Sequence, residues 1–244
     1  MRAPDGSTVA GKTNSGACSF LEHDGLCAIH RTGGQLALPL SCRMFPRSVL
    51  IDGRGTFISL SHFCPTAAAL LFEDGPPAAI VEAPASLVDV GPLDGLDARH
   101  AWPPLLRAGV LMDLESYDAW ERLGVELLTR ESVEPHASLT ALERTAARIA
   151  VWTPGEGSLL HRVRNAFEAV VPSTAVLAPH DMPVKRWLAS RFFGCWVAYQ
   201  RDGLPAIVRY LAGCFRTFEA EFARDGNALE AIRHSDLRIM HTEQ

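Results

Sequence analysis

Four of the six cysteines in this 244-residue chain lie within its first 64 residues, at Cys18, Cys27, Cys42 and Cys64. Thiolates are soft, anionic donors, and four of them satisfy either a zinc ion or an iron–sulfur cluster. The spacing contains no Cys-x-x-Cys pair, which is the strongest zinc signature. Three interpretations therefore stay open: a metal site, disulfide bonds between these cysteines, and unbonded cysteines that are simply buried.

The neighbours of the cysteines favour the metal site. Positive or proton-accepting side chains follow the thiols closely in the sequence, at His30, Arg31, Arg43 and Arg47. Positive charge stabilises the thiolate form and offsets the negative charge of a four-thiolate site. Glycines and prolines between the cysteines allow loops to fold around an ion without a conventional core. In a reducing cytosol, clustered cysteines are also more often metal ligands or redox groups than structural disulfides.

Two histidines near the cysteines are weaker candidates for metal ligands. His30 follows Cys27 by three residues, and His62 precedes Cys64 by two. Each has the alternative of a solvated or supporting group, as do the other histidines, which are scattered and show no His-Glu-x-x-His spacing. The remaining cysteines, Cys195 and Cys214, lie in helical patterns and are expected to be small buried side chains.

Two stretches carry a resemblance to a known family. "CSFLEHDGLCAIHRTGGQLALPLSCRMFPR" and "SLSHFCPTAAALL" resemble the cysteine-cluster region of the YkgJ family, described as a zinc- or iron-chelating domain. Within it they are most similar to the branch that includes the FliB-type flagellin lysine N-methylases. The matching elements are Cys18-x-Phe-Leu, Asp24-Gly-Leu-Cys27 with Ile29-His30, Cys42-Arg-x-Phe-Pro-Arg47, and Ser59-Leu-Ser-x-x-Cys64-Pro65. The distal "FFGCWVAYQRDGL" is similar to a helix that such proteins carry.

The resemblance implies a metal or iron–sulfur site at Cys18, Cys27, Cys42 and Cys64. It also implies a protein-lysine N-methyltransferase that uses S-adenosylmethionine, with a protein such as flagellin as the substrate. Family members carry a further cysteine-rich stretch ahead of the first matching segment. This chain begins close to Cys18, so we expect it to lack that stretch.

The sequence leaves open whether the protein is an enzyme. A conventional methyltransferase needs a strand, a glycine-rich turn and a helix, and the nearest match is "LVDVGPLDGLDARH" with Asp89, Gly91 and Gly95. Pro92 and Leu93 stand where glycine would let the backbone approach the cofactor, so we interpret this segment as a connector. The alternatives to an enzyme are a non-catalytic module stabilised by zinc and a truncated, inactive relative.

Charge and hydropathy exclude several classes of protein. The formal charge is −5, which gives no global basic field to attract nucleic acid or anionic lipid. The first residues are polar, unlike a secretory signal, and no run of 18 uncharged apolar residues occurs, as a membrane span requires. We therefore expect a cytoplasmic protein with neither nucleic acid nor membrane as partner.

The sequence patterns along the chain predict a mainly α protein, in which two domains position the cysteines. Residues 1–73 form a small, irregular cysteine-cluster domain with a short hairpin, because "SVLIDGRGTFISLS" places Asp-Gly between β-prone runs. Residues 74–104 are rich in proline and glycine and form a connector with a short strand at 79–81. Residues 105–244 form a domain of five or six helices, on which the first domain packs.

Helix boundaries follow from capping residues. Ser116 is the expected N-cap of the helix in "SYDAWERLGVELLTR", and Thr140 with Glu143 has the spacing of a capping box in the next helix. Pro172 should end the third. A single helix over 182–202 should end at Gly203 and carry an apolar stripe made of Leu188, Phe192, Cys195, Trp196 and Tyr199. A last long helix over 204–225 should carry a second stripe, made of Val208, Leu211, Phe215, Phe218 and Phe222.

Overall fold

The chain divides into two compact units. The computed structural model describes residues 11, 13, 14, 17–75, 78–83, 95–170, 175–200 and 202–242. The first unit is Met1–Phe45 with Ala83–Asp94, and the second is Pro46–Glu82 with Gly95–Gln244. The predicted hairpin and the segment of Cys64 belong to the second, larger unit in this division.

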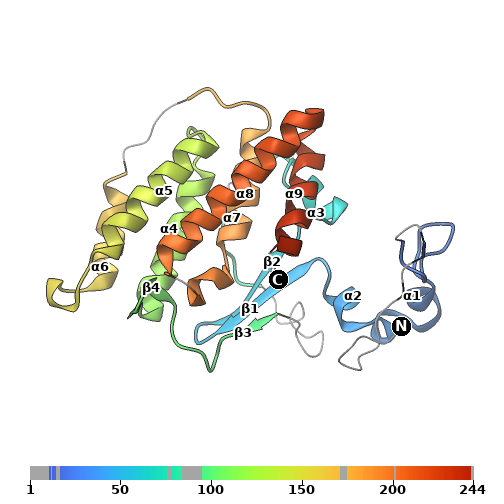
Figure 1. Ribbon diagram of the computed structural model, residues 1–244, viewed down its shortest axis with the longest axis horizontal. Helices are drawn as coiled ribbons and strands as arrows, with labels where there is room; N and C mark the ends of the chain where they lie inside the picture. The colour runs from blue at the N-terminus through green and yellow to red at the C-terminus, as the bar shows by residue number, and fades with distance from the viewer. Residues whose placement is uncertain are drawn as a thin grey trace. The chain divides into compact units, whose positions relative to one another are not determined.

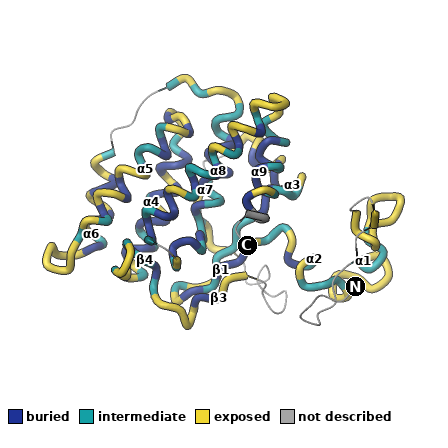
Figure 2. Tube along the Cα trace, viewed as in Figure 1, coloured by how far each residue is buried: buried dark blue, intermediate teal, exposed yellow. Residues whose placement is uncertain are grey.

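The second unit is mainly helical, as predicted (Figure 1). The part of residues 105–244 that the structure describes contains six α-helices: α4 (Leu114–Thr129), α5 (Pro135–Ala150), α6 (Leu159–Glu168), α7 (Asp181–Phe192), α8 (Leu204–Asp225) and α9 (Ala228–Thr242). The helices pack side by side and their facing sides are buried (Figure 2). Trp120, Trp187, Leu142 and Leu211 lie in this core with no exposed surface. No described helix is long and apolar enough to cross a membrane.

A small sheet belongs to the same unit. β1 (Arg47–Asp52) and β2 (Gly55–Leu60) form the predicted antiparallel hairpin, with Asp52 opposite Gly55. β3 (Leu96–Asp97) adds to β1 in parallel, at the end of the segment predicted to be a connector. A Cβ atom at Gly95 would lie 2.2 Å from the Val49 carbonyl oxygen, so glycine is needed there for close approach to β1.

The strand predicted at 79–81 is absent, because residues 78–83 adopt no regular structure. Residues 87–94, which include Asp89 and Gly91 of the segment compared with a cofactor-binding turn, lie outside the described residues. Two shorter strands, β4 (Leu105–Arg107) and β5 (Val110–Leu111), pair with each other just before α4. β4 and β5 form a two-stranded sheet separate from that of β1, β2 and β3.

Two predicted helix starts are wrong: α4 begins earlier because the Asp113 side chain caps it, and α5 begins earlier at Pro135, a residue favoured in the first helical turn. α4 begins at Leu114, and its N-cap Asp113 accepts hydrogen bonds from the backbone nitrogen and the hydroxyl of Ser116 at 2.8 and 2.7 Å. α5 begins at Pro135 with Glu134 as the N-cap, which places Thr140 inside the helix. α6 ends at Glu168, and the predicted stop at Pro172 lies outside the described residues.

The helix predicted over 182–202 is interrupted after Phe192. Gly194 has a φ of 63°, a left-handed conformation that breaks the helix, and a 3-10 turn, η4 (Trp196–Tyr199), follows. Gly203 is the N-cap of α8 rather than the C-terminal stop of α7. With its φ of 67°, a Cβ atom at Gly203 would lie 1.9 Å from the Leu105 carbonyl oxygen, so only glycine fits between β4 and α8.

One buried lysine gives a testable pH dependence. Lys185 of α7 has no exposed surface, and its Nζ donates to the carbonyl oxygens of Arg130 and Val133, the latter at 2.7 Å. Burial lowers the pKa of Lys185 from 10.5 to about 8. Between these pH values the folded chain binds fewer protons than the unfolded chain, so a rise in pH favours folding. A neutral amine still donates to both carbonyl oxygens, which lets the group lose its proton without losing its partners.

Lys185→Met should remove this dependence. The free energy of unfolding of the wild type, minus that of the variant, should increase by roughly 1–3 kcal/mol between pH 8 and pH 10.5. Urea denaturation of both proteins across this pH range measures the difference. Lys12 is the second lysine of the chain and lies outside the described residues. A difference that does not change with pH would show that Lys185 keeps its proton in the folded state.

The first unit has no apolar core of its own in its described residues. Its elements are short: α1 (Ala28–Gly33), the 3-10 turn η1 (Gln35–Ala37) and α2 (Leu40–Met44). Met44 is the one buried residue among those described in this unit, and apolar side chains such as Leu26 and Leu36 are exposed. The tube around α1 and α2 is mostly coloured exposed or intermediate in Figure 2. A segment of this size usually needs a metal ion or disulfide bonds to hold a fold.

Candidate metal centre

A tight turn brings the backbone around Cys18 and Cys27 together. The Ala28 backbone nitrogen donates to the Phe20 carbonyl oxygen at 2.9 Å, and Leu21 and Cys27 form an antiparallel bridge. The turn between them is closed by Asp24, whose carboxylate accepts from the Leu26 nitrogen at 3.0 Å. Cys18 lies two residues before Phe20 on one arm, and Cys27 lies directly before Ala28 on the other. The two cysteines therefore lie on opposite arms of one turn.

Arg31 stabilises the same turn from α1. Its guanidinium forms ion pairs with Glu22, at 2.5 Å, and with Asp24. The side chains of all three residues are exposed, so each pair contributes little to stability. The positive charge of Arg31, predicted to support thiolates, is thus already shared by two carboxylates.

The four predicted ligands occupy different kinds of position. Cys18 and Cys42 are exposed, and Cys27 and Cys64 are partly exposed; all four are free thiols. Cys27 and Cys64 are the N-cap residues of α1 and α3 (Pro65–Leu70), whereas Cys42 lies within α2. The first three belong to the first unit and Cys64 to the second.

Within the described parts of the chain, no three histidine, cysteine or acidic side chains lie together as metal ligands. The set of four cysteines therefore stays a prediction. Its chemistry fits zinc or an iron–sulfur cluster, because four accessible thiols can supply every donor that either centre needs. By contrast, Cys195 and Cys214 are 3% and 1% exposed in the core of the second unit, as predicted.

The two histidine candidates differ sharply in environment. His30 is exposed on α1. His62 is 3% exposed, and burial lowers its pKa to about 4, aided by Arg191 and opposed by Asp236. Its Nδ1 has no hydrogen-bond partner among the described residues. His62 is therefore a neutral, buried ring in the segment that leads to Cys64.

Asp236 organises the segment around His62. Although it has no exposed surface, its carboxylate accepts from the Ser61 hydroxyl at 2.9 Å, the Phe63 backbone nitrogen at 3.2 Å, Trp187 Nε1 at 3.0 Å and the Arg191 guanidinium. Burial opposes ionisation, but Arg191 and the hydrogen bonds outweigh it and hold the pKa of Asp236 below its usual value. One carboxylate of α9 thus joins α7 to residues 61–63, directly before Cys64.

A second buried network attaches the hairpin to the helices. Arg54 of the β1–β2 turn binds Asp52 at 2.8 Å and Glu121 of α4 at 3.0 Å. The Tyr199 hydroxyl donates to Asp52, and the Gly194 nitrogen donates to Glu121 at 2.8 Å. Burial opposes ionisation of Asp52, but the hydrogen bonds from Arg54 and Tyr199 hold its pKa below its usual value.

These contacts explain why "FFGCWVAYQRDGL" is built as it is. Its glycine breaks the helix and places a backbone nitrogen on Glu121, and its tyrosine reaches the hairpin turn. Burial raises the pKa of Glu121. These hydrogen bonds and ion pairs have a structural role: they join the hairpin to α4 and η4, and every polar group named here has a partner among them. Neither network was predicted from the sequence, although charged residues on the apolar faces of α4 and α9 are a signal for them.

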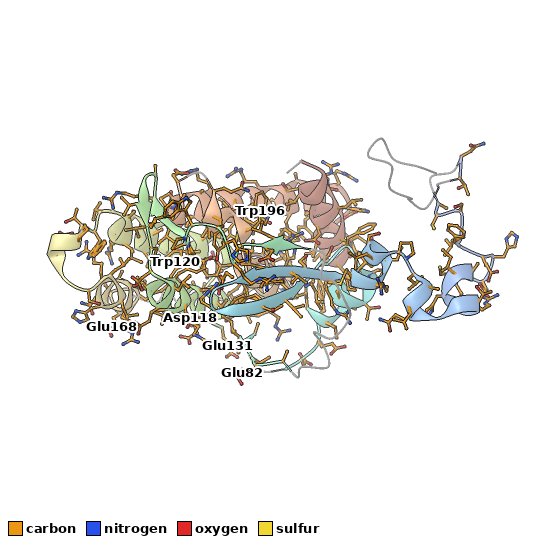
Figure 3. All side chains as sticks on the ribbon, turned by 90° about the horizontal axis from the view of Figure 1, so that it is seen from below. Glu82, Asp118, Trp120, Glu131, Glu168 and Trp196 are labelled. Atoms are coloured by element: carbon orange, nitrogen blue, oxygen red, sulfur yellow. The ribbon has the colours of Figure 1, made fainter. Side chains whose placement is uncertain are left out.

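A groove lies between α4 and α6. It has a volume of about 640 Å³, and its walls carry charges of both signs around an apolar floor. Asp118 of α4 and Glu168 of α6 line it and lie along the same side of the unit (Figure 3). The walls of the groove carry both acidic and basic side chains, so their charge selects no class of ligand.

No protein-family model, no curated protein and no solved structure matches this chain. The likeness to the cysteine-cluster family therefore stays an expectation based on the motifs quoted above. A function therefore has to be inferred from the chemistry and the environment of the described side chains.

Proposed function

We propose that this protein binds zinc or an iron–sulfur cluster through Cys18, Cys27, Cys42 and Cys64. One observation carries the proposal: the described part of the first unit has a single buried residue, yet it contains three of the four accessible thiols. A fold without an apolar core needs another source of stability, and metal ligation contributes directly to folding. Free cysteines are usually buried, so four accessible ones are better explained as ligands.

The turn of Cys18 and Cys27 supports this proposal. Backbone hydrogen bonds and the Asp24 cap pair its two arms before any metal binds. Ligands already held near each other lose less conformational entropy when they bind an ion. Cys42 would complete a three-thiolate set within one unit, and Cys64 is the proposed fourth ligand.

Metal content of protein purified without oxygen is the direct test, together with visible absorption. We expect either zinc, or iron with sulfide and absorption near roughly 400 nm as thiolate-ligated clusters show. The double variant Cys27→Ser/Cys42→Ser should lose the metal. Cys64→Ser, analysed separately, should lower the affinity, because three thiolates hold the ion less tightly than four. Cys214→Ala is the matched control, since it removes a buried thiol and should keep the metal.

The proposal would be contradicted if the wild type contains no metal and both ligand variants fold as well as the wild type. That result would favour an inactive relative instead. Zinc without iron would favour a non-catalytic module in which the ion ties the first unit together. In that case the double variant should also make the first unit sensitive to proteolysis, while the helical unit stays resistant.

We further propose methyl transfer from S-adenosylmethionine to protein lysines, such as those of flagellin, as the activity of an iron–sulfur form. Only the family resemblance supports this second step. Anaerobic incubation of the loaded protein with S-adenosylmethionine and flagellin, followed by mass spectrometry of the lysines, tests it. A methylated product with the wild type and none with Cys27→Ser/Cys42→Ser would support it. No product from a fully loaded protein would reject it and leave metal binding intact.

A further inference from the structure

A second groove, between α8 and α9, differs in charge from the rest of the chain. Its volume is about 490 Å³, and its walls include Arg209 and Arg216 of α8 and Arg238 of α9. None of the described residues that line it carries a carboxylate, although the whole chain has a formal charge of −5. The two helices lie side by side in the second unit (Figure 1), so the groove does not depend on the first unit.

The arginines are arranged as binding groups. Arg209 pairs with Asp202 at 2.5 Å and Arg238 with Glu221 at 2.8 Å, and neither carboxylate lines the groove. Such pairs limit the rotamers of a guanidinium whose side chain is still about 60% exposed, namely 61% for Arg209 and 60% for Arg238. Arg216 is exposed and forms no ion pair with the residues that the structure describes. Guanidinium groups bind phosphate and carboxylate oxygens in pairs.

Gly213 is an independent sign that a ligand approaches this wall. It lies in the middle of α8, where glycine is less favourable than alanine by about 1 kcal/mol. A Cβ atom at Gly213 would meet only Arg216 Nη2, at 3.8 Å, among the described residues. At Gly124 of α4, by contrast, a Cβ atom would lie 2.3 Å from Phe192, so packing explains that glycine. No such packing explains Gly213, whose bare backbone lines the groove.

Hydroxyl groups complete the wall. Tyr210 and Thr217 line the groove, and the Thr217 hydroxyl donates to the Gly213 carbonyl oxygen at 3.0 Å. A hydroxyl oxygen held in this way still has lone pairs, whereas its proton is engaged with the backbone. The three guanidiniums around a volume typical of small-molecule sites select an anionic ligand of modest size, and the Thr217 oxygen can accept a hydrogen bond from an organic part of that ligand.

We propose that the α8–α9 groove binds a phosphorylated small molecule of nucleotide size. Phosphate is favoured over a single carboxylate because three positive side chains face one groove, and a phosphoryl group offers more charge and more acceptor oxygens. The proposal goes beyond metal binding and does not rest on it, since none of the four cysteine ligands lines this groove.

Titration calorimetry of the full chain with ADP and with inorganic pyrophosphate tests the proposal. We expect both to bind, with an affinity that falls as salt is added. Arg216→Ala should weaken binding by about 10-fold or more, as the loss of a charge-assisted contact does. Arg144→Ala, which removes an exposed arginine of α5, is the matched control and should bind as the wild type. Tighter binding of ADP than of pyrophosphate would show that the groove also holds the organic part of the ligand; equal binding would show a site for the phosphates alone.

Gly213→Ala separates binding from stability. The added methyl group fits the described surroundings and favours the helix, so the melting temperature should rise by about 1–4 °C. It should also fill the groove wall and weaken ADP binding several-fold. Absence of binding by the wild type, or equal affinity in the wild type and Arg216→Ala, would overturn the proposal. A Gly213→Ala protein that is more stable and binds ADP unchanged would overturn the role of the bare backbone.

Discussion

Asp236→Ala should lower the free energy of unfolding by about 3–5 kcal/mol, the range found when one partner of a buried ion pair is removed. The substitution leaves the Arg191 guanidinium, the Trp187 indole and the Ser61 hydroxyl without their shared acceptor. Each buried donor without a partner costs free energy, and the charged one costs most. The loss should appear as a lower midpoint in urea denaturation, with Trp187 as one of the fluorescent reporters.

Glu230→Ala is the control for Asp236→Ala on the same helix. Glu230 pairs with Arg233 at 2.8 Å on α9, and both side chains are partly exposed, at 34% and 23%, so its loss should cost only about 1 kcal/mol. Replacing both members of the buried pair, by Asp236→Leu with Arg191→Met, should recover part of the loss, because no charge is then buried alone. A cost for Asp236→Ala as small as that of Glu230→Ala would show that the carboxylate is solvated and does not hold the segment before Cys64.

Arg54→Leu should also destabilise the protein by about 3–5 kcal/mol at neutral pH. Arg54 is the common partner of Asp52 and Glu121, which are 4% and 1% exposed. Without it, two carboxylates remain buried next to each other, and their pKa values should rise. The folded variant would then bind more protons than its unfolded chain above about pH 4, so acid should favour folding of the variant relative to the wild type. The stability difference should therefore shrink between pH 8 and pH 5.

Arg122→Ala provides the matched control for Arg54→Leu. Arg122 pairs with Asp118 at 2.8 Å on the exposed face of α4, a pair worth about 0.3–0.5 kcal/mol. Adding Glu121→Gln to Arg54→Leu should restore part of the stability, because the amide oxygen still accepts from the Gly194 nitrogen and carries no charge. Guanidinium denaturation with circular dichroism at pH 5 and pH 8 measures all four proteins. A stability difference that is the same at both pH values would show that Asp52 and Glu121 remain solvated in the variant.

The two buried networks have a consequence for the proposed metal site. They fix the hairpin and residues 61–63 to the helical unit, so the segment that ends at Cys64 has a defined position without any metal. The described residues of the first unit have no comparable support. Metal loss should therefore unfold the first unit and leave the second folded.

Local sequence signals were sufficient for much of the helical unit. Leu211 and Phe218 repeat on one face of a long segment, and both are buried at 0% and 3% exposed in α8. The Asp-Gly between β-prone runs correctly predicted the hairpin, whose register pairs Asp52 with Gly55. Cys214 was expected to be buried within this helical pattern, and it is 1% exposed in α8. These features depend on residues close together in the chain, and hydrophobic periodicity encodes them directly.

Other features depend on residues far apart and were missed for that reason. The break after Phe192 arises because Glu121 accepts from the Gly194 nitrogen, a contact across 73 positions. Gly203 looked like a helix stop until the close approach of Leu105 showed why glycine is needed there. The sequence by itself determined the helical character and the hairpin, and it predicted the four candidate cysteine ligands. Only the tertiary structure decided where helices break and which charges are buried together, because burial turns a weak surface charge into a strong constraint.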